Sequence, residues 1–513
     1  MRTMLITLIF IFFSAPAVAQ KKWSAKWIAH PQVAPQEHAV VHFRTEFELD
    51  IVPDSFPVHI SADNHFRLYV NGEWVAFGPQ LGEVTHWRYD THELRDYLRP
   101  GRNVLAVQVT NWGHYRMFGM QSVHTALIVQ GRGAAEIVST SGYDDRWKCY
   151  RNRGLRGHEV LWRVNQPDII GGLYANNPTD SLLATHYPWG WETRDYDDSN
   201  WETAGFLENG QLAAHGSGFL WLLEPRTTPP QVMKREPFRT VRESNAPAGP
   251  KSWWLGRQAI TLPAGAKYRF LLDMETVTLG LPELRWNGGK DARMKFTWAE
   301  NLFNPDGTKA HRDSVAGQLV KGYFDVVVAD GGSDRRYTPT WYRAFRYLEI
   351  QVETAEEALE LFAPVNRRVT SSLPVVAEWS SDDPELDAAF ALSQRTVEIC
   401  TQDYFLSDAY YETMQYVGDT KVHALVWQAL TGDLRHTRNA LLDFHRARNE
   451  DGVLKSCYPL RYNFYHSSYS LVYVDMVWDY FQRSGDTAFV RRLLPGIRQT
   501  LDYFDAHFDE GRG

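Results

Sequence analysis

"SSDDPELDAAFALSQRTVEIC", residues 380–400, divides the sequence into two parts with different patterns. From Trp23 to about Val375, short apolar runs stand between Gly, Pro and Asn turns, which is typical of β-strands. Beyond this stretch, apolar residues recur at the spacing of an α-helix. The chain of 513 residues also exceeds the roughly 250–300 residues at which a single core stops growing. The sequence therefore predicts several domains, strand-rich first and helical last.

Two segments downstream share one helical plan. "DTKVHALVWQALTGD", residues 419–433, and "SLVYVDMVWDYFQRSGD", residues 470–486, each combine an apolar stripe with a Ser/Thr-Gly-Asp ending. The expected stripe residues are Val422, Leu425, Val426 and Ala429 in the first segment, and Val472, Tyr473, Met476, Val477 and Tyr480 in the second. The two endings lie 53 residues apart, and another amphipathic segment follows each. This internal repeat predicts stacked helical hairpins that form part of a toroid.

The upstream part contains a clear hairpin signal. "HFRLYVNGEWVAFGP", residues 65–79, alternates apolar and polar residues and places Asn71-Gly72 at the turn, a dipeptide typical of tight hairpins. "NVLAVQVTNWG", residues 103–113, predicts a strand that is buried on both faces. Short strands between turn residues favour a β-sandwich.

A Pro-rich segment separates this block from a second strand block. "EPRTTPPQVMKREP" occupies residues 224–237, and Pro fixes extended backbone and removes hydrogen-bond donors, as in a linker. We predict β-sandwich domains at residues 20–235 and 236–378, followed by a helical domain at residues 379–513.

The beginning of the chain has the layout of a cleavable secretory signal. "MRTMLITLIFIFFSAPAVAQ" combines Arg2, an apolar run and small residues at Ala17 and Ala19. Residues 1–19 are therefore a predicted signal peptide, with Gln20 first in the mature chain. No other stretch reaches the roughly 18 uncharged apolar residues of a membrane-spanning helix. The sequence predicts a secreted or periplasmic protein.

Composition limits the class of partner. The formal net charge of -8 argues against nucleic acid, because phosphate binding requires clustered Lys and Arg. Aromatic residues make up 14% of the chain and can fill cores or offer apolar faces to sugar rings. Cys149, Cys400 and Cys457 are too widely spaced to predict a zinc site or a disulfide framework, although a single Cys400–Cys457 bridge stays open. We expect a neutral substrate and no cofactor or metal.

Three carboxylates fall within "SDAYYETMQYVGDTK", residues 407–421. Asp419 precedes a helical pattern and is expected at the N-cap or next to it, since an acid there satisfies free backbone N–H groups and favours the positive end of a helix. Asp408 and Glu412 lie too far upstream for that role. Glu412 is flanked by aromatic residues, and partial desolvation would raise its pKa and keep it protonated, as a general acid in glycoside hydrolysis requires.

Several phrases of the sequence resemble one family. "WSAKWIAHP", "FRLYVNGEWVAFGP", "WAENLFNPDGTKAHRD", "YRAFRYLEIQV" and "SDAYYETMQYVGDTK" are together similar to the bacterial α-L-rhamnosidases, family 78 of the glycoside hydrolases, over nearly the whole mature chain. The resemblance implies accessory β-sandwiches, the first of them galactose-binding-like, before an (α/α)6 six-hairpin catalytic domain. It also implies an inverting hydrolase that releases terminal α-L-rhamnose from glycans or glycosides.

The family motif is of the kind Asp-x-Pro-x-Arg-(Glu/Asp)-x-x-x-Trp-x-Gly-Asp. By resemblance, Glu412 is the general acid, while Asp408, Tyr416 and Asp419 belong to the sugar pocket. Ala409-Tyr410-Tyr411 replaces the Pro and Arg, the first interval is one residue shorter, and Tyr416 stands in place of Trp. Without the Arg, the sugar hydroxyls and the acid are held differently. A related six-hairpin glycosidase that acts on another sugar is therefore an alternative.

Two more residues follow from the resemblance, on a helix that lines the pocket in family members. Asp475 and Trp478 are expected to face the sugar, although helical spacing suits Trp478 equally well for the barrel core.

The helical part is shorter than a whole toroid. Twelve helices need roughly 330–380 residues, whereas Ser381 to Gly513 provides 133. We therefore expect an incomplete (α/α)6 toroid whose general base, a Glu on a later helix in the family, lies beyond Gly513. On this hypothesis residues 1–513 alone are inactive. The alternative from a different class is a non-catalytic, secreted carbohydrate-binding protein whose β-sandwiches hold the ligand.

Overall fold

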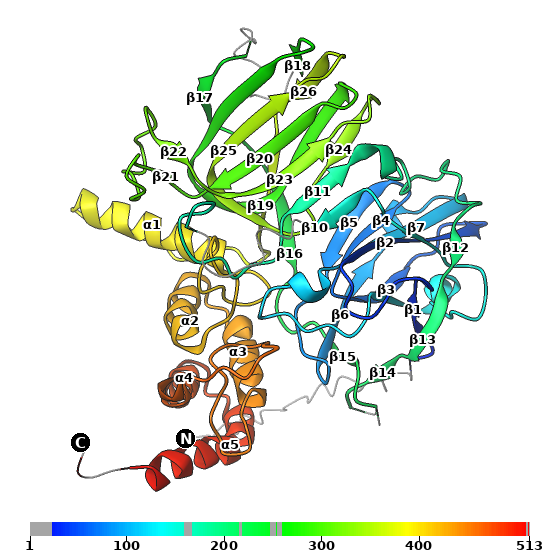
Figure 1. The fold of residues 1–513 in the computed structure, drawn as a ribbon. Helices are drawn as coiled ribbons and strands as arrows, with labels where there is room; N and C mark the ends of the chain where they lie inside the picture. Colours follow the sequence, from blue (N-terminus) through cyan, green and yellow to red (C-terminus); the bar gives the residue numbers. More distant parts are fainter. Residues whose placement is uncertain are drawn as a thin grey trace, which may run out of the picture.

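The structure is a computed structural model that describes residues 23–157, 167–214, 218–246, 253, 259–508 and 511. The predicted signal peptide, residues 1–19, lies outside the described residues. Figure 1 shows two strand-rich parts side by side, with a group of helices packed on one side of them.

The first strand-rich part consists of two sheets with a common hydrophobic core. The six-stranded sheet has the order β12 (Glu202–Thr203), β9 (Lys148–Arg151), β2 (Ala39–Leu49), β7 (Gly101–Asn111), β4 (His65–Val70) and β5 (Glu73–Gly78). The seven-stranded sheet has the order β13 (Gly205–Asn209), β1 (Lys26–Ala29), β8 (Ala126–Gly131), β3 (Pro57–Asp63), β6 (Trp87–Glu93), β15 (Leu222–Pro225) and β14 (Gln211–Leu212). Phe43, Leu68 and Val107 of the first sheet share one core with Ile60 and Val129 of the second.

The hairpin predicted at Asn71-Gly72 is confirmed. β4 and β5 pair antiparallel on either side of this dipeptide, whose φ angles are 52° and 89°. Positive φ at both positions matches the right-handed twist of the flanking strands and favours Asn and Gly. The strand predicted within residues 103–113 is also present, as β7, and its residues from 103 to 111 are buried.

The second strand-rich part is built on one large sheet. Its main path is β10 (Leu155–Gly157), β11 (Asp180–Leu183), β23 (Tyr323–Val328), β20 (Arg293–Ala299), β25 (Arg343–Glu353), β19 (Lys267–Gly288), β26 (Leu359–Phe362) and β18 (Ala259–Leu262). β16 (Gln231–Pro237), β17 (Thr240–Ser244), β24 (Arg335–Tyr337) and β27 (Val365–Ser371) branch from this path, and β21 (Leu302–Phe303) pairs with β22 (Leu319–Val320). Short 3-10 turns lie at Arg95–Tyr97, Gly113–Tyr115, Gly133–Val138 and Ala184–His186.

Two strands that come before the predicted domain boundary, β10 and β11, belong to the large sheet of the second strand-rich part. β10 and β11 precede the predicted boundary at residues 235 and 236, yet β11 pairs in parallel with β23 of the large sheet. The boundary itself falls inside β16, which pairs antiparallel with β27 along its whole length. Sheet pairing therefore connects the two parts more closely than a flexible linker would.

The helical segment contains α1 (Pro384–Cys400), α2 (Val417–Thr431), α3 (Arg435–Arg446), α4 (Ser467–Ser484) and α5 (Thr487–Ala506). Gly432 and Gly485 end α2 and α4 with φ angles of 69° and 62°, the left-handed conformation that Gly adopts at helix ends. The repeated hairpin plan is thus confirmed for the pairs α2–α3 and α4–α5. Among the described residues, no helix is both long and apolar enough to cross a membrane.

The apolar stripe predicted for α2 is partly wrong. Ala424, Trp427 and Leu430 form its buried face, whereas Val422 and Ala429 are exposed. This helix carries apolar residues on most of its circumference, so periodicity does not define which face packs. In α4 the prediction is confirmed for Tyr473, Met476, Val477 and Tyr480, all of which are buried, and Val472 is half-buried.

Buried ion pairs join the helical segment to the first strand-rich part. Arg226 donates to Asp90 at 2.7 Å and to Asp403, after α1, at 2.5 Å. Arg446 of α3 donates to Glu224 of β15 at 2.9 Å. These contacts fix the position of the helices against the sheets, and hence the loop between α1 and α2.

Candidate active site

The loop between α1 and α2, residues 401–416, carries the predicted general acid and is anchored on both sides. The Tyr410 hydroxyl donates to the Trp298 carbonyl of β20 at 2.9 Å, and its ring lies 4.9 Å from that of Tyr323. The next carbonyl, that of Tyr411, accepts from the Ala175 N–H at 2.8 Å. The Tyr410 side chain therefore holds the loop against the large sheet, and the backbone of Tyr411 ties it to the connection between β10 and β11.

Asp408 stabilises the turn of this loop. Its carboxylate accepts from the backbone N–H groups of Tyr410, at 2.6 Å, and of Tyr411. Burial raises the pKa of Asp408, and the two N–H donors oppose that rise. Side chains of this kind commonly mimic a backbone turn. Asp408 thus shapes the chain just before Glu412, and its contact with sugar stays a prediction.

Glu412 is half-buried at the wall of a cavity of about 400 Å³. The cavity is lined by Phe118, Leu173, Ala175, Glu412, Met414, Tyr416, Cys457, Leu460, Tyr462, Asn463 and Phe464. Glu412 is the one acid among these described lining residues. An acid in a mostly apolar, aromatic wall has the surroundings that a general acid needs.

The electrostatic surroundings of Glu412 favour its protonated form. Burial raises its pKa, the negative charges of Asp408 and Asp419 raise it further, and a hydrogen bond with the Tyr416 side chain opposes the rise. A hydroxyl that donates to a carboxylate stabilises the charged form. The structure therefore brings Glu412 and Tyr416 together at the wall of one cavity, and their roles toward sugar stay a prediction.

Asp419 lies in the first turn of α2, but it is not the N-cap. Tyr416 occupies that position, and no side chain makes the capping hydrogen bond. Of the two predicted positions, N-cap and near-cap, the second is confirmed: α2 begins at Val417, two residues before Asp419, so this carboxylate stands inside the first turn. Its negative charge near the positive end of the helix remains favourable. Gly418 leaves space for Tyr469, since an added Cβ would lie 2.8 Å from that ring.

Asp475 and Trp478 of α4 do not line this cavity. Asp475 forms an ion pair with Lys421 of α2. Trp478 is 57% exposed and contacts Phe481, with ring centroids 6.1 Å apart. Their predicted contact with sugar stays a prediction.

Sequence reasoning missed most of the cavity wall. Phe118 comes from the first strand-rich part and Leu173 from the connection between β10 and β11 of the large sheet, while Tyr462 and Phe464 come from the connection between α3 and α4. These residues have no motif of their own, and only the fold brings them to Glu412. Cys149, Cys400 and Cys457 are free and buried, so the Cys400–Cys457 bridge is not formed. Within the part of the chain that the structure describes, no cluster of His, Cys, Asp or Glu is arranged to hold a metal ion.

The match to a family model covers the helices and this loop. Residues 374–512 match the model described as the bacterial α-L-rhamnosidase six-hairpin glycosidase domain. This segment is therefore similar to the six-hairpin glycosidase domain of bacterial α-L-rhamnosidases. In this domain Glu412 lies in the loop that enters the first helical hairpin.

Relatives extend the similarity across the whole chain. An α-L-rhamnosidase of Streptomyces avermitilis is 24% identical over 519 residues, which cover 95% of this chain and 44% of that protein. The chain thus spans less than half the length of this curated relative. The crystal structure of a GH78 family rhamnosidase of Bacillus sp. GL1 has a TM-score of 0.81 at 15% identity, covering 96% of this chain and 70% of that one. The S. avermitilis α-L-rhamnosidase complexed with L-rhamnose has a TM-score of 0.66 at 20% identity, covering 92% and 42%.

The contact between Tyr416 and Glu412 leads to a direct test in the six-hairpin domain. We expect Tyr416→Phe to raise the pKa of Glu412 further, because it removes the hydroxyl that stabilises the carboxylate. Carboxyl ¹³C NMR of the 513-residue chain measures this pKa. Tyr465→Phe, on an exposed ring outside the cavity lining, is the control and leaves the pKa unchanged. A Glu412 pKa that is equal in wild type and Tyr416→Phe would contradict the hydrogen bond.

Proposed function

We propose that this chain acts in an inverting α-L-rhamnosidase that removes terminal α-L-rhamnose from glycans or glycosides. The observation that carries the proposal is Glu412, whose pKa is raised by burial at the wall of an aromatic cavity in the glycosidase domain. The L-rhamnose complex of the S. avermitilis relative supports rhamnose as the sugar. The two-sheet part and the helical hairpins are, in this proposal, a β-sandwich and a portion of an (α/α)6 toroid.

Glu412 acts as the general acid in this mechanism. Its carboxyl proton passes to the glycosidic oxygen as the bond between that oxygen and the anomeric carbon breaks. A second carboxylate, roughly 6.5–9.5 Å away on an inverting route, removes a proton from the water that attacks the opposite face of the sugar. Among the described residues that line the cavity, Glu412 is the one acid. The carboxylate that acts as general base is therefore proposed to lie outside this lining.

The remaining residues position the acid and the sugar. Asp408 sets the turn before Glu412, and Tyr416 holds its carboxylate. Asp419, Asp475 and Trp478 are proposed to contact sugar hydroxyls or ring faces. Export by the signal peptide at residues 1–19 is also part of the proposal, and it suits an enzyme that acts on glycans outside the cytoplasm.

The stereochemistry of the product tests the mechanism. With an aryl α-L-rhamnoside and a form of the protein that contains both carboxylates, we expect ¹H NMR to show β-L-rhamnose as the first product. Water attacks opposite the leaving group in a single displacement, which inverts the anomeric centre. Release of α-L-rhamnose first would contradict the inverting route. Hydrolysis of another aryl glycoside in preference to the rhamnoside would contradict the substrate.

A further inference from the structure

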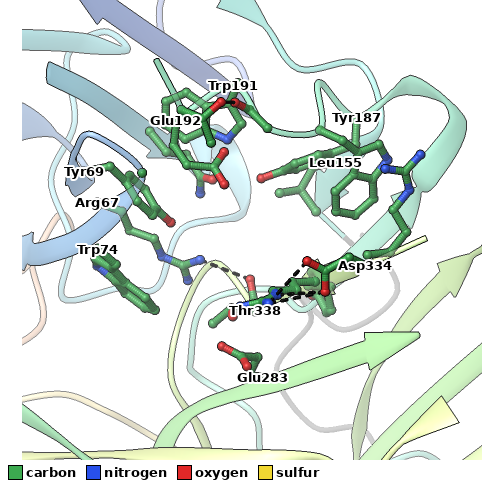
Figure 2. Close-up of a pocket in the computed structure, with 18 of the residues that line it drawn as sticks. Arg67, Tyr69, Trp74, Leu155, Tyr187, Trp191, Glu192, Glu283, Asp334 and Thr338 are labelled. Carbon is green, nitrogen blue, oxygen red and sulfur yellow. Dashed lines mark hydrogen bonds and ion pairs between the residues drawn. The ribbon is translucent and has the colours of Figure 1, made fainter. Parts of the chain in front are cut away.

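A second cavity, of about 630 Å³, lies between the two strand-rich parts (Figure 2). Its walls come from β4, β5 and β7, from the loop at residues 187–193, and from β19, β24 and β27. It shares no lining residue with the Glu412 cavity. Its volume falls within the roughly 300–1,000 Å³ that is typical of small-molecule sites.

The arginines in this wall are held in place by partners. Arg67 is buried, donates to the Thr338 carbonyl at 3.1 Å and lies 5.0 Å from the ring centroid of Trp74. Arg367 forms an ion pair with Glu283, and Arg336 pairs with Asp334 at 3.3 Å. Arg367 and Arg336 are therefore paired with acids before any ligand enters, whereas Arg67 is held by carbonyl oxygens and keeps its positive charge at the wall.

Glu192 differs from these paired groups. Its half-buried carboxylate has no hydrogen bond or ion pair with another of the described residues. Burial raises its pKa, while a hydrogen bond from its own backbone N–H and the attraction of Arg336 and Arg44 oppose that rise. Figure 2 shows this carboxylate and the hydroxyls of Tyr69 and Tyr187 directed into the same space. The cavity thus presents a carboxylate with unused acceptor positions beside two hydroxyls. A ligand that supplies hydroxyl donors can use these positions.

Charge and shape together define the ligand class. An anionic ligand would meet Glu192, and a cationic ligand would meet Arg67, Arg335 and their neighbours. A neutral ligand rich in hydroxyls can donate to Glu192 and accept from the arginines, two of which, Arg67 and Arg335, lie over the rings of Trp74 and Trp189.

We infer that this cavity is a non-catalytic binding site for a neutral saccharide, with Glu192 accepting hydrogen bonds from its hydroxyls. The site is separate from the Glu412 cavity, so the inference does not depend on the proposed hydrolase activity. It would hold a glycan against the junction of the two strand-rich parts.

Saturation-transfer NMR on the 513-residue chain tests this site, with L-rhamnose, D-galactose, D-mannose, D-glucuronate and D-glucosamine as probes. We expect at least one neutral sugar to bind more tightly than the two charged ones. Glu192→Gln keeps the side-chain shape and should weaken that binding about tenfold, since charge-assisted hydrogen bonds are roughly twice as strong as neutral ones. Tyr69→Phe, which removes one hydroxyl and keeps the ring, should weaken it less.

Two controls make the result specific. Asp195→Asn changes an acid of the same loop whose side chain is 91% exposed, and should leave binding unchanged. Glu412→Gln should also leave it unchanged. The inference is overturned by the absence of binding of every neutral sugar, by tighter binding of a charged probe, or by unchanged affinity in Glu192→Gln. Binding that is lost in Glu412→Gln and kept in Glu192→Gln would place the ligand in the other cavity and overturn it as well.

Discussion

Replacing Glu412 with Gln lowers turnover of rhamnosides with poor leaving groups by about 10²–10⁴-fold, the usual contribution of general acid catalysis. This result is expected in a form of the protein that carries both members of the catalytic pair. Gln has nearly the same shape as Glu but no proton to transfer. An aryl rhamnoside whose aglycone leaves as a stable anion needs little protonation, so its turnover should fall much less. Comparison of kcat for an alkyl and a nitrophenyl α-L-rhamnoside measures the difference.

The pH dependence provides a second measurement of the same role. Glu412 must be protonated to act, so activity is present below its pKa and is lost as pH rises through it. Because burial raises that pKa, the alkaline limb of the profile lies above the ordinary range of a Glu. Asp502 is an exposed acid on α5, and Asp502→Asn is the matched control. This variant should leave both kcat values and the alkaline limb of the pH profile unchanged. Equal losses on both substrates in Glu412→Gln would refute the acid role.

Local signals in the sequence predicted those features that one segment determines alone. Asn71-Gly72 forms its hairpin turn, and Gly432 and Gly485 end their helices, because a backbone conformation with positive φ selects for these residues. Glu412 could also be found, since the pattern of acids and aromatics around it is contiguous. The position of Asp419 relative to the helix start could not, because helix boundaries depend on packing as well as on the capping residue.

Features that depend on distant segments were beyond the sequence. The parallel pairing of β11 with β23 joins residues 181–183 to residues 326–328. A local sequence pattern does not indicate which distant strand a buried strand pairs with. The wall of the Glu412 cavity likewise combines Phe118 with Phe464. Glu192 had no motif at all, and its position at the wall of a cavity becomes visible only when the two strand-rich parts are in contact. Sites formed where two parts of the chain meet can therefore be found only from the structure, whereas a site within one loop can be predicted from the sequence.

The largest expected effect on stability lies at such a junction. We expect Asp403→Ala to lower the free energy of unfolding by about 3–5 kcal/mol, the range for breaking a buried ion pair by removing one partner. The side chains of Arg226 and Asp403 are 12% and 7% exposed. Arg226 would keep Asp90 but lose the carboxylate that neutralises it on the helical side. Urea unfolding followed by tryptophan fluorescence measures the change.

A double-mutant cycle distinguishes the ion pair from simple loss of packing. Arg226→Met combined with Asp403→Ala should cost less than the sum of the two single changes, because the double variant leaves no unpaired cation in the interface. Glu353→Ala is the control, since its pair with Lys267 is 55% and 81% exposed and exposed pairs contribute less than about 1 kcal/mol. Additive losses in the cycle would show that Asp403 stabilises the junction through packing alone. Since the loop that bears Glu412 begins at this contact, Asp403→Ala should also weaken the positioning of the general acid.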